Sequence, residues 1–315
     1  MHFSVQTATV TSMPIDTKPK VIAVVGPTAA GKTGIAIELA LRFNGEVISV
    51  DSRQIYRKLD IGTAKVTKEE MKGVPHHLID IVDIDTVYTA NDFLREADTA
   101  ITDISERGKL PIVAGGTLFY VELLRRTMQP APVPPNYMLR SRLDALSTEA
   151  LLKKLTELDP RRAATIDPHN RRRLIRAIEI VDTLGAVPPA LSQQICPYQI
   201  LLLGVTRAKS ELRERFALRA KTWLEAGLLQ EVEGLLKQGI SQARLKELGF
   251  EYTLTLSLLT GEIDTETFYE RFVQKNWQYA KRQMTWLQRD NAVRWVDPDN
   301  IDEIANLAQE FLAPS

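Results

Sequence analysis

A buried strand, a glycine-rich turn and a helix follow one another between residues 21 and 43, and this succession leaves few possible folds. The continuous apolar run 21–25, Val-Ile-Ala-Val-Val, predicts a parallel strand that is covered on both faces. Residues 33–43 carry apolar side chains at helical spacing. The turn between them fits the pattern G-x-x-x-x-G-K-[ST] and consists of Gly26, Pro27, Thr28, Ala29, Ala30, Gly31, Lys32 and Thr33.

This turn predicts a phosphate-binding loop. Successive backbone N–H groups in such a loop surround a phosphate group, and the N-terminus of the following helix adds a favourable electrostatic potential. Lys32 supplies a positive charge for the terminal phosphate, and the Thr33 hydroxyl suits a Mg²⁺ ion that phosphate oxygens also bind. The pattern leaves open whether the phosphate is transferred or departs as a leaving group, and whether ATP carries it.

The rest of the chain indicates the α/β class. Further strands are predicted at 46–50, 77–81, 111–114 and 199–205, and a helix is predicted at 91–107. Alternating strands and helices form mostly parallel sheets with helices on both faces. We therefore expect a P-loop NTPase-like parallel sheet with helices on both faces.

An all-helical module interrupts this predicted sheet. The proline-rich stretch 129–135 predicts an extended linker, the chain from 137 to about 184 looks helical, and the next strand begins at 199. The expected organisation is a disordered leader at 1–19, a P-loop catalytic core at 20–124 and 197–315, and a helical insertion at 125–196. From 210 to 289 the chain is again mainly helical, with breaks at Gly227, Gly239 and Gly261.

Charge is distributed unevenly along the chain. The 315 residues include 40 Lys and Arg and 40 Asp and Glu, so the formal net charge is zero. Between residues 120 and 222, however, 18 basic residues accompany 10 acidic ones, and the remainder has 22 against 30. A uniformly basic surface is excluded, whereas a local basic region that binds phosphate groups is favoured.

Composition also limits the chemistry and the location. Hydrophobic residues make up 44% of the chain, which excludes disorder of the whole chain. Because Cys196 is the one cysteine, a disulfide framework within the chain is excluded and a cysteine zinc cluster is disfavoured. No stretch approaches the roughly 20 apolar residues of a membrane span, and the N-terminal segment lacks the core of a signal peptide. We expect a cytoplasmic protein that does not contact a membrane.

Polar residues follow the second predicted strand directly. Asp51 and Ser52 stand where the carboxyl end of a parallel strand faces the ligand crevice. A carboxylate there can act as a base or a metal ligand, and capping a helix is the structural alternative. His76 and His77 would point to opposite faces of their strand, which makes them a poor chelating pair and favours a structural role for at least one of them.

Six segments, in order along the chain, resemble the motifs of one family. They are 26–33 (similar to GPTASGKT), 51–56 (DSxxxY), 60–65 (DIGTAK), 75–80 (PHHLID), 115–120 (GGTxLY) and 280–287 (AKRQxTWL). Together they resemble the bacterial tRNA dimethylallyltransferase family, which prenylates adenosine 37 of tRNA. The loop alone would be weak evidence, whereas six ordered motifs that span about residues 21–290 are specific.

The resemblance implies a reaction and its catalytic residues. The N6 amine of adenosine 37, in the tRNA anticodon loop, would attack carbon 1 of dimethylallyl diphosphate and release diphosphate. Asp51 would be the general base, and Thr28 would lie beside the diphosphate. Arg219, which matches the last position of a family motif R-[IV]-x-x-R at 215–219, would bind the diphosphate with loop 26–33. The implied cofactor is Mg²⁺, with Thr33 as its protein ligand.

The resemblance also implies that the helical insertion at 125–196 is tRNA-binding, and it implies which residues contact tRNA. They are Asp51, Ser52, Arg53 and Gln54 around the target base, Thr117 and Arg140 at the tRNA channel, and Arg172, Arg173 and Arg176 in an arginine-rich helix. Proteins bind single-stranded RNA loops through splayed bases and arginine contacts. For the arginine run, a solvated helix face is the alternative. The expected partners are tRNA and dimethylallyl diphosphate, and we expect a monomer.

Two segments depart from the family pattern. Asp167 and Asn170 occupy the first and last positions of the family's H-x-N-D segment. The G-Y-x-E element reads Gly-Phe-Glu-Tyr at 249–252, so its acid is moved or lost. Both departures lie in regions that the resemblance implies contact tRNA.

Trp223 and Trp286 lie at amphipathic spacings, which predicts that they pack in the core.

Other functions remain open from the residues alone. A P-loop small-molecule kinase, or a prenyltransferase that acts on free adenylate, would use the phosphate loop but not the basic insertion. A tRNA-binding or nucleotide-switch protein without catalysis would make no use of Asp51 beside the loop.

Overall fold

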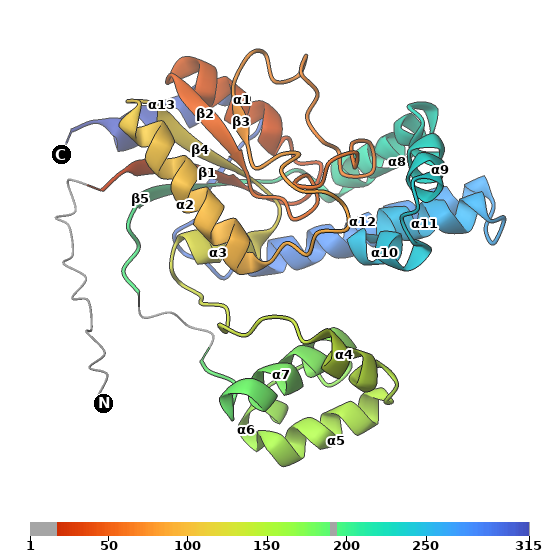
Figure 1. Ribbon diagram of the computed structural model, residues 1–315. Helices are drawn as coiled ribbons and strands as arrows, with labels where there is room; N and C mark the ends of the chain where they lie inside the picture. Colours follow the sequence, from red (N-terminus) through yellow and green to blue (C-terminus); the bar gives the residue numbers. More distant parts are fainter. Residues whose placement is uncertain (1–17, 190–193, 315) are drawn as a thin grey trace, which may run out of the picture. The chain divides into compact units, whose positions relative to one another are not determined.

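The computed structural model describes residues 18–189 and 194–314 (Figure 1). The chain divides into two compact units. We call the part up to Arg125 and from Ile195 onward the core unit, and Arg126–Gln194 the helical unit. Much of the predicted leader, residues 1–17, lies outside the described residues.

Within the described residues, the core unit has a parallel sheet of six strands in the order β3-β2-β4-β1-β5-β6. The strands are β1 (Lys20–Val25), β2 (Gly45–Ser49), β3 (His76–His77), β4 (Leu110–Gly115), β5 (Gln199–Val205) and β6 (Arg294–Val296). Val25, at the end of β1, lies between Gly115 of β4 and Gly204 of β5. Because the chain order reverses at β1, the ligand crevice of such a sheet lies at the carboxyl end of this strand.

Helices cover both faces of the sheet (Figure 1). On one face, α1 (Lys32–Arg42) and α13 (Ile301–Leu312) pack on a buried cluster that includes Ile22, Ile112 and Ile304. On the other face lie α2 (Ala90–Glu106) and α3 (Leu118–Leu124), whose rings Phe93 and Tyr120 stack with centroids 3.9 Å apart. The predicted α/β class with helices on both faces is therefore confirmed.

In the part of the chain that the structure describes, five helices extend the core unit beyond the sheet. They are α8 (Lys209–Glu225), α9 (Leu228–Lys237), α10 (Gln242–Leu248), α11 (Phe250–Leu259) and α12 (Thr265–Leu287). Phe216 of α8 packs against Ala280 of α12, and Phe268 and Phe272 of α12 are fully buried beneath α11. The helices break near Gly227, Gly239 and Gly261, as the sequence predicts, and also at Gly249.

The helical unit consists of α4 (Tyr137–Asp144), α5 (Thr148–Leu158), α6 (Pro160–Ala163) and α7 (Arg171–Leu184). Leucines and isoleucines of these helices, among them Leu143, Leu155 and Leu174, form a core of their own. Asn170 caps α7 by accepting a hydrogen bond from the N–H of Arg173, and Gly185 ends the helix in a left-handed conformation. The segment predicted to be helical is thus four helices separated by short turns.

The prediction of a strand at 77–81 is wrong, because β3 contains only His76 and His77. Leu78 and Asp80 have φ angles of 60° and 55°, which a strand cannot accommodate. The turn they make brings the Asp80 carboxylate to the Lys65 ammonium at 2.6 Å. The sequence also gave no expectation for β6 and α13, which complete one edge and one face of the sheet.

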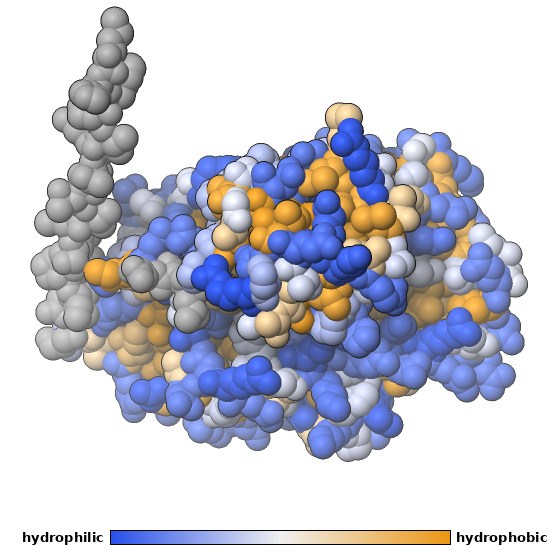
Figure 2. All heavy atoms as spheres, turned by 90° about the horizontal axis from the view of Figure 1, so that it is seen from below, coloured by the Kyte–Doolittle hydropathy of each residue, from blue (hydrophilic) through white to orange (hydrophobic). Residues whose placement is uncertain are grey.

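Hydrophilic residues predominate on the face of the molecule seen in Figure 2, with hydrophobic ones gathered in patches. Among the described residues, no helix combines the length and the apolar character needed to cross a bilayer.

Candidate active site

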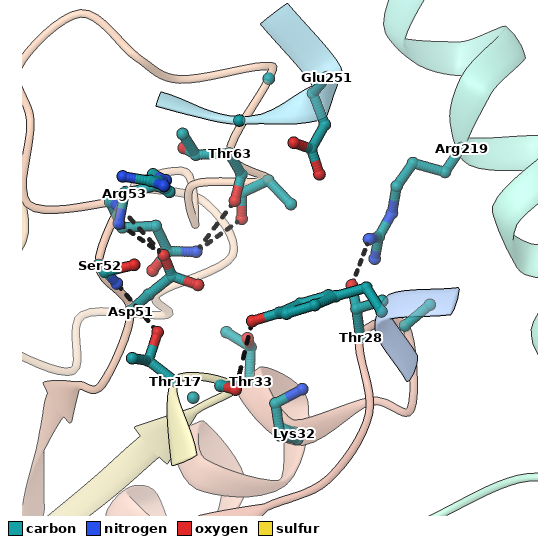
Figure 3. A pocket seen from close by; sticks show the side chains of 18 of the residues that line it. Thr28, Lys32, Thr33, Asp51, Ser52, Arg53, Thr63, Thr117, Arg219 and Glu251 are labelled. Atoms are coloured by element: carbon teal, nitrogen blue, oxygen red, sulfur yellow. Dashed lines mark hydrogen bonds between the residues drawn. The ribbon is translucent and has the colours of Figure 1, made fainter. Parts of the chain in front are cut away.

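A cavity of about 690 Å³ opens in the core unit at the carboxyl ends of β1 and β4. Its walls come from the loop after β1, the loops that follow β2, the end of β4, and helices α8, α11 and α12. In Figure 3, Asp51, Ser52 and Arg53 lie on one side, Thr28 and Arg219 lie on the opposite side, and Glu251 points between them. Segments that are far apart in the sequence therefore line the same cavity.

The phosphate loop forms the floor of this cavity. Gly26 lacks room for a side chain, since a Cβ atom there would lie 2.2 Å from the carbonyl oxygen of Val205. Gly31 has a φ of 101° and is the N-cap of α1, so the N-terminus of this helix lies at the loop. The Lys32 ammonium donates to the Pro27 carbonyl at 2.8 Å, and burial lowers the pKa of Lys32 to about 8. A bound anion would favour the charged form of this lysine.

Arg219 and Gln283 contact the loop from two long helices. The Arg219 guanidinium, on α8, donates to the Thr28 hydroxyl at 2.8 Å and lies over the ring of Trp223 at 5.4 Å. The Gln283 amide, on α12, accepts from the Thr28 N–H at 3.0 Å and donates to the Gly116 carbonyl at 2.8 Å. The sequence predicted a diphosphate role for Arg219 but none for Gln283, whose only signal was its place in the AKRQ segment.

Asp51 lies on the opposite wall, in a turn that follows β2. One carboxylate oxygen accepts from the Arg53 N–H at 2.8 Å and from the Gln54 N–H at 3.4 Å. No described α-helix begins at Asp51, so it is not a helix cap. The Ser52 N–H donates to the Thr117 hydroxyl at 3.2 Å, which ties this turn to the end of β4. The structure thus brings Asp51, Ser52, Arg53, Gln54 and Thr117 together beside the phosphate loop.

The Gln54 side chain is fixed within the protein. Its amide donates to the carbonyls of Thr63 at 3.3 Å and Ala64 at 3.1 Å, and its oxygen accepts from the Ser49 hydroxyl at 3.0 Å. Both N–H donors are therefore used by the loop at 60–65. Gln54 shapes the pocket wall in this state.

Glu251 is a second carboxyl group in the cavity that the sequence did not assign. Burial raises its pKa to about 7, the nearby Asp51 carboxylate adds to this, and the Arg53 and Arg219 guanidiniums oppose it. In the described part of the chain its carboxyl group makes no hydrogen bond to another side chain. The departure at 249–252 thus places an acid in the pocket one position earlier than the family pattern has it.

The two tryptophans differ from the prediction of core packing. Trp223 packs edge-on against Phe272 at 5.4 Å but also lines the cavity, with Leu218 and Phe250. The prediction is wrong for Trp286, which is 37% exposed and donates to the Glu122 carboxylate at 3.3 Å. Amphipathic spacing alone did not distinguish a wall of the pocket from the core.

The predicted arginines of the helical unit fall into two groups. Arg140 and Arg176 both bind the carboxylate of Glu179, which is fully buried, and Arg140 does so through two bonds of 2.9 and 2.8 Å. Although burial opposes it, these contacts hold the pKa of Glu179 at about 2. Arg172 and Arg173 are exposed, and no described residue forms an ion pair with either. Only the second pair presents free cations in this state.

Thr33 is the residue of the cavity that could help to hold a Mg²⁺ ion. No described group of three or more His, Cys, Asp or Glu side chains could hold a metal ion. Mg²⁺ is commonly bound by only one or two protein oxygens together with substrate phosphates and water. The exposed Thr33 hydroxyl, at the cavity beside Lys32, fits that requirement.

The His77 ring contacts the Glu46 carboxylate at 2.7 Å, which agrees with the predicted structural role for at least one of the two histidines.

Comparisons with known proteins agree with this geometry. A family model described as IPP transferase matches residues 54–290. The chain is 44% identical to a tRNA dimethylallyltransferase of Thermomicrobium roseum, with 88% of this chain and 86% of the relative aligned. It is 40% identical to a protein of the same name from Staphylococcus aureus, with 90% and 94% aligned.

Solved structures give the same result. A tRNA isopentenylpyrophosphate transferase from Bacillus halodurans superposes with a TM-score of 0.69 at 38% identity, covering 94% of this chain and 97% of that one. A eukaryotic dimethylallyltransferase that acts on tRNA gives 0.73 at 28% identity, covering 93% and 77%. The phosphate loop, the Asp51 turn and these matches over most of the sequence lead to one conclusion: the chain belongs to the IPP transferase family, which includes the tRNA dimethylallyltransferases.

Proposed function

We propose that this enzyme transfers a dimethylallyl group from dimethylallyl diphosphate to N6 of adenosine 37 in the anticodon loop of tRNA and releases diphosphate. The observation that carries the proposal is that one cavity holds both a phosphate-binding loop and, on the facing wall, the carboxylate of Asp51. A group that binds the leaving diphosphate and a group that can accept a proton are what this reaction needs.

The diphosphate side lowers the barrier by stabilising negative charge. As the bond from carbon 1 to oxygen breaks, charge accumulates on the diphosphate, and preorganised positive groups stabilise it there. Lys32, Arg219 and the N–H groups of the loop are placed for this, and Thr28 is fixed between Arg219 and Gln283. Mg²⁺ bound at Thr33 would add positive charge at the phosphate oxygens.

The base side removes a proton from the attacking amine. An aromatic amine is a weak nucleophile, and its nitrogen becomes acidic as the bond to carbon forms. The Asp51 carboxylate, oriented by the N–H groups of Arg53 and Gln54, would accept that proton. The side chains at 51–54 and Thr117 would surround the target base once it has left its stack.

Apolar side chains beside Arg219 provide a place for the dimethylallyl group. Leu218 is 63% exposed and lines the cavity together with Trp223 and Phe250. Small-molecule pockets are lined mainly by hydrophobic and aromatic side chains with a few polar groups, and this lining suits a ligand with an apolar chain on a diphosphate.

The exposed Arg172 and Arg173 would bind the phosphates of the anticodon stem-loop, whereas Arg140 and Arg176 would act chiefly by holding α4 on α7. Because its relatives are named for acting on tRNA, we further propose that the enzyme is cytoplasmic. We also propose that it works as a monomer.

The test combines the purified enzyme with Mg²⁺, undermodified tRNA and labelled dimethylallyl diphosphate. We expect label on N6 of adenosine 37 and one diphosphate released per group transferred. Label on free adenylate, or phosphate transfer from ATP to a small molecule without label on tRNA, would contradict the proposal. A tRNA with guanosine at position 37 is the matched control and should accept no label.

A further inference from the structure

The carboxylate of Glu231, on α9, binds three consecutive backbone N–H groups of the loop at 60–62. One oxygen accepts from Asp60 at 3.0 Å and from Ile61 at 2.7 Å, and the other accepts from Gly62 at 3.2 Å. Successive N–H groups that converge in this way form a concave anion site, and hydrogen bonds to a charged acceptor are about twice as strong as neutral ones. A side chain about 170 residues further along the chain thus fixes this loop.

Tyr252, on α11, completes the contact. Its hydroxyl donates to the same carboxylate at 2.9 Å, and its side chain is almost fully buried. Its ring lies so close to Gly62 that a Cβ atom there would be 2.6 Å from the ring. Only glycine at position 62 lets the loop reach both the ring and the carboxylate.

The other end of the same loop holds Gln54. The carbonyls of Thr63 and Ala64 accept both N–H groups of the Gln54 side-chain amide. The backbone N–H of Gln54 in turn donates to Asp51, as does that of Arg53. Hydrogen bonds therefore run without interruption from Glu231 through the loop and Gln54 to the turn that carries Asp51.

We propose that Glu231 is a positioning residue of the transfer reaction: by fixing the loop at 60–64 it fixes Gln54, and through Gln54 it aims Asp51 at the amine of the target base. The inference rests on the proposed function, in which Asp51 accepts the proton. No hydrogen bond among the described residues joins Glu231 to the phosphate loop. Its effect therefore belongs to the base side of the cavity and leaves the diphosphate side unchanged.

The first test replaces Glu231 by Gln, which keeps the size of the side chain but removes the charge and one acceptor. We expect the single-turnover rate of transfer to fall at least tenfold at saturating substrates, while the Kd of dimethylallyl diphosphate stays within twofold. The amides of residues 60–62 should exchange hydrogen faster. Glu233→Gln, on the same helix, is the matched control and should change neither quantity. Glu231→Asp keeps the charge and should restore part of the rate.

A second variant approaches the same contact from α11. Tyr252→Phe removes one of the four hydrogen bonds to the carboxylate, so the fall in rate should lie between those of the control and Glu231→Gln. An unchanged rate in a folded Glu231→Gln protein would overturn the proposal. The proposal would also be overturned if the affinity for dimethylallyl diphosphate fell by the same factor as the rate and thermal stability fell as well. That result would indicate a purely structural role. If the wild-type enzyme transfers no prenyl group, the proposed function itself fails, and the exchange of amides 60–62 shows separately whether Glu231 holds the loop.

Discussion

Two carboxyl groups share the cavity, and their neighbours give them different properties. Asp51 accepts hydrogen bonds from two backbone N–H groups and faces the space where the target nucleobase would lie. Glu251 makes no hydrogen bond to another described side chain, and burial raises its pKa to about 7. Keeping Glu251 ionised in the folded protein therefore costs free energy that an exposed glutamate does not cost.

This difference predicts a pH dependence of stability. Because the folded pKa of Glu251 lies above its ordinary value of 4.5, the folded state binds the extra proton more tightly, and this group destabilises the fold increasingly as the pH rises from about 4.5 to 7. Glu251→Gln lacks this titration. The free energy of unfolding of the variant, relative to that of the wild type, should therefore increase by on the order of 2 kcal/mol between pH 5 and pH 8. Urea unfolding at both pH values measures the difference, and a difference independent of pH would contradict the prediction.

At the scale of helices and strands, the sequence predicts what local pattern controls. The loop at 26–33 and the strands beside it follow from an apolar run, glycines and a helix start, and the structure confirms them. The end of β3 at His77 depends instead on the left-handed backbone conformations of Leu78 and Asp80 and on the ion pair between Lys65 and Asp80. Glu179 pairs with both Arg140 and Arg176 only because α4 packs on α7. The arginine pattern of a single helix does not reveal that packing.

The buried ion cluster between α4 and α7 makes a prediction for these elements. Glu179→Ala leaves two guanidiniums without their partner, so the helical unit should lose about 3 kcal/mol of stability. Hydrogen exchange of peptides from residues 139–184 measures this locally, and peptides from β1 and α1 should be unaffected. Glu157→Ala, at an exposed position on α5, is the control. Equal exchange in the two variants would show that the cluster does not stabilise this unit.

At the scale of the whole molecule, the zero net charge conceals a basic middle segment and an acidic remainder. Counting charges predicts where the excess lies but not which cations are free. The structure assigns Arg176 and Arg140 to an internal acid, and leaves Arg172 and Arg173 exposed at the start of α7. The site is likewise assembled from segments between residues 28 and 283, whose meeting depends on the fold as a whole.

The exposed pair should therefore account for a measurable part of tRNA affinity. Replacing Arg172 and Arg173 together by Gln should weaken tRNA binding and reduce the slope of log K against log salt by about 1 to 2. Protein stability and the rate at saturating tRNA should stay near wild type. Lys237→Gln, at an exposed position on α9, is the matched control. An unchanged salt slope in the double variant would assign tRNA binding to other cations.

The central claim is that Asp51 removes the proton of the attacking amine in a cavity whose opposite wall holds the diphosphate. The most direct test is the single-turnover rate of Asp51→Asn at saturating tRNA and dimethylallyl diphosphate, measured together with the Kd of each substrate. We predict a rate roughly 10²- to 10⁴-fold below wild type, with both Kd values within threefold. A rate within tenfold of wild type, or a loss of tRNA binding as large as the loss of rate, would contradict this mechanism.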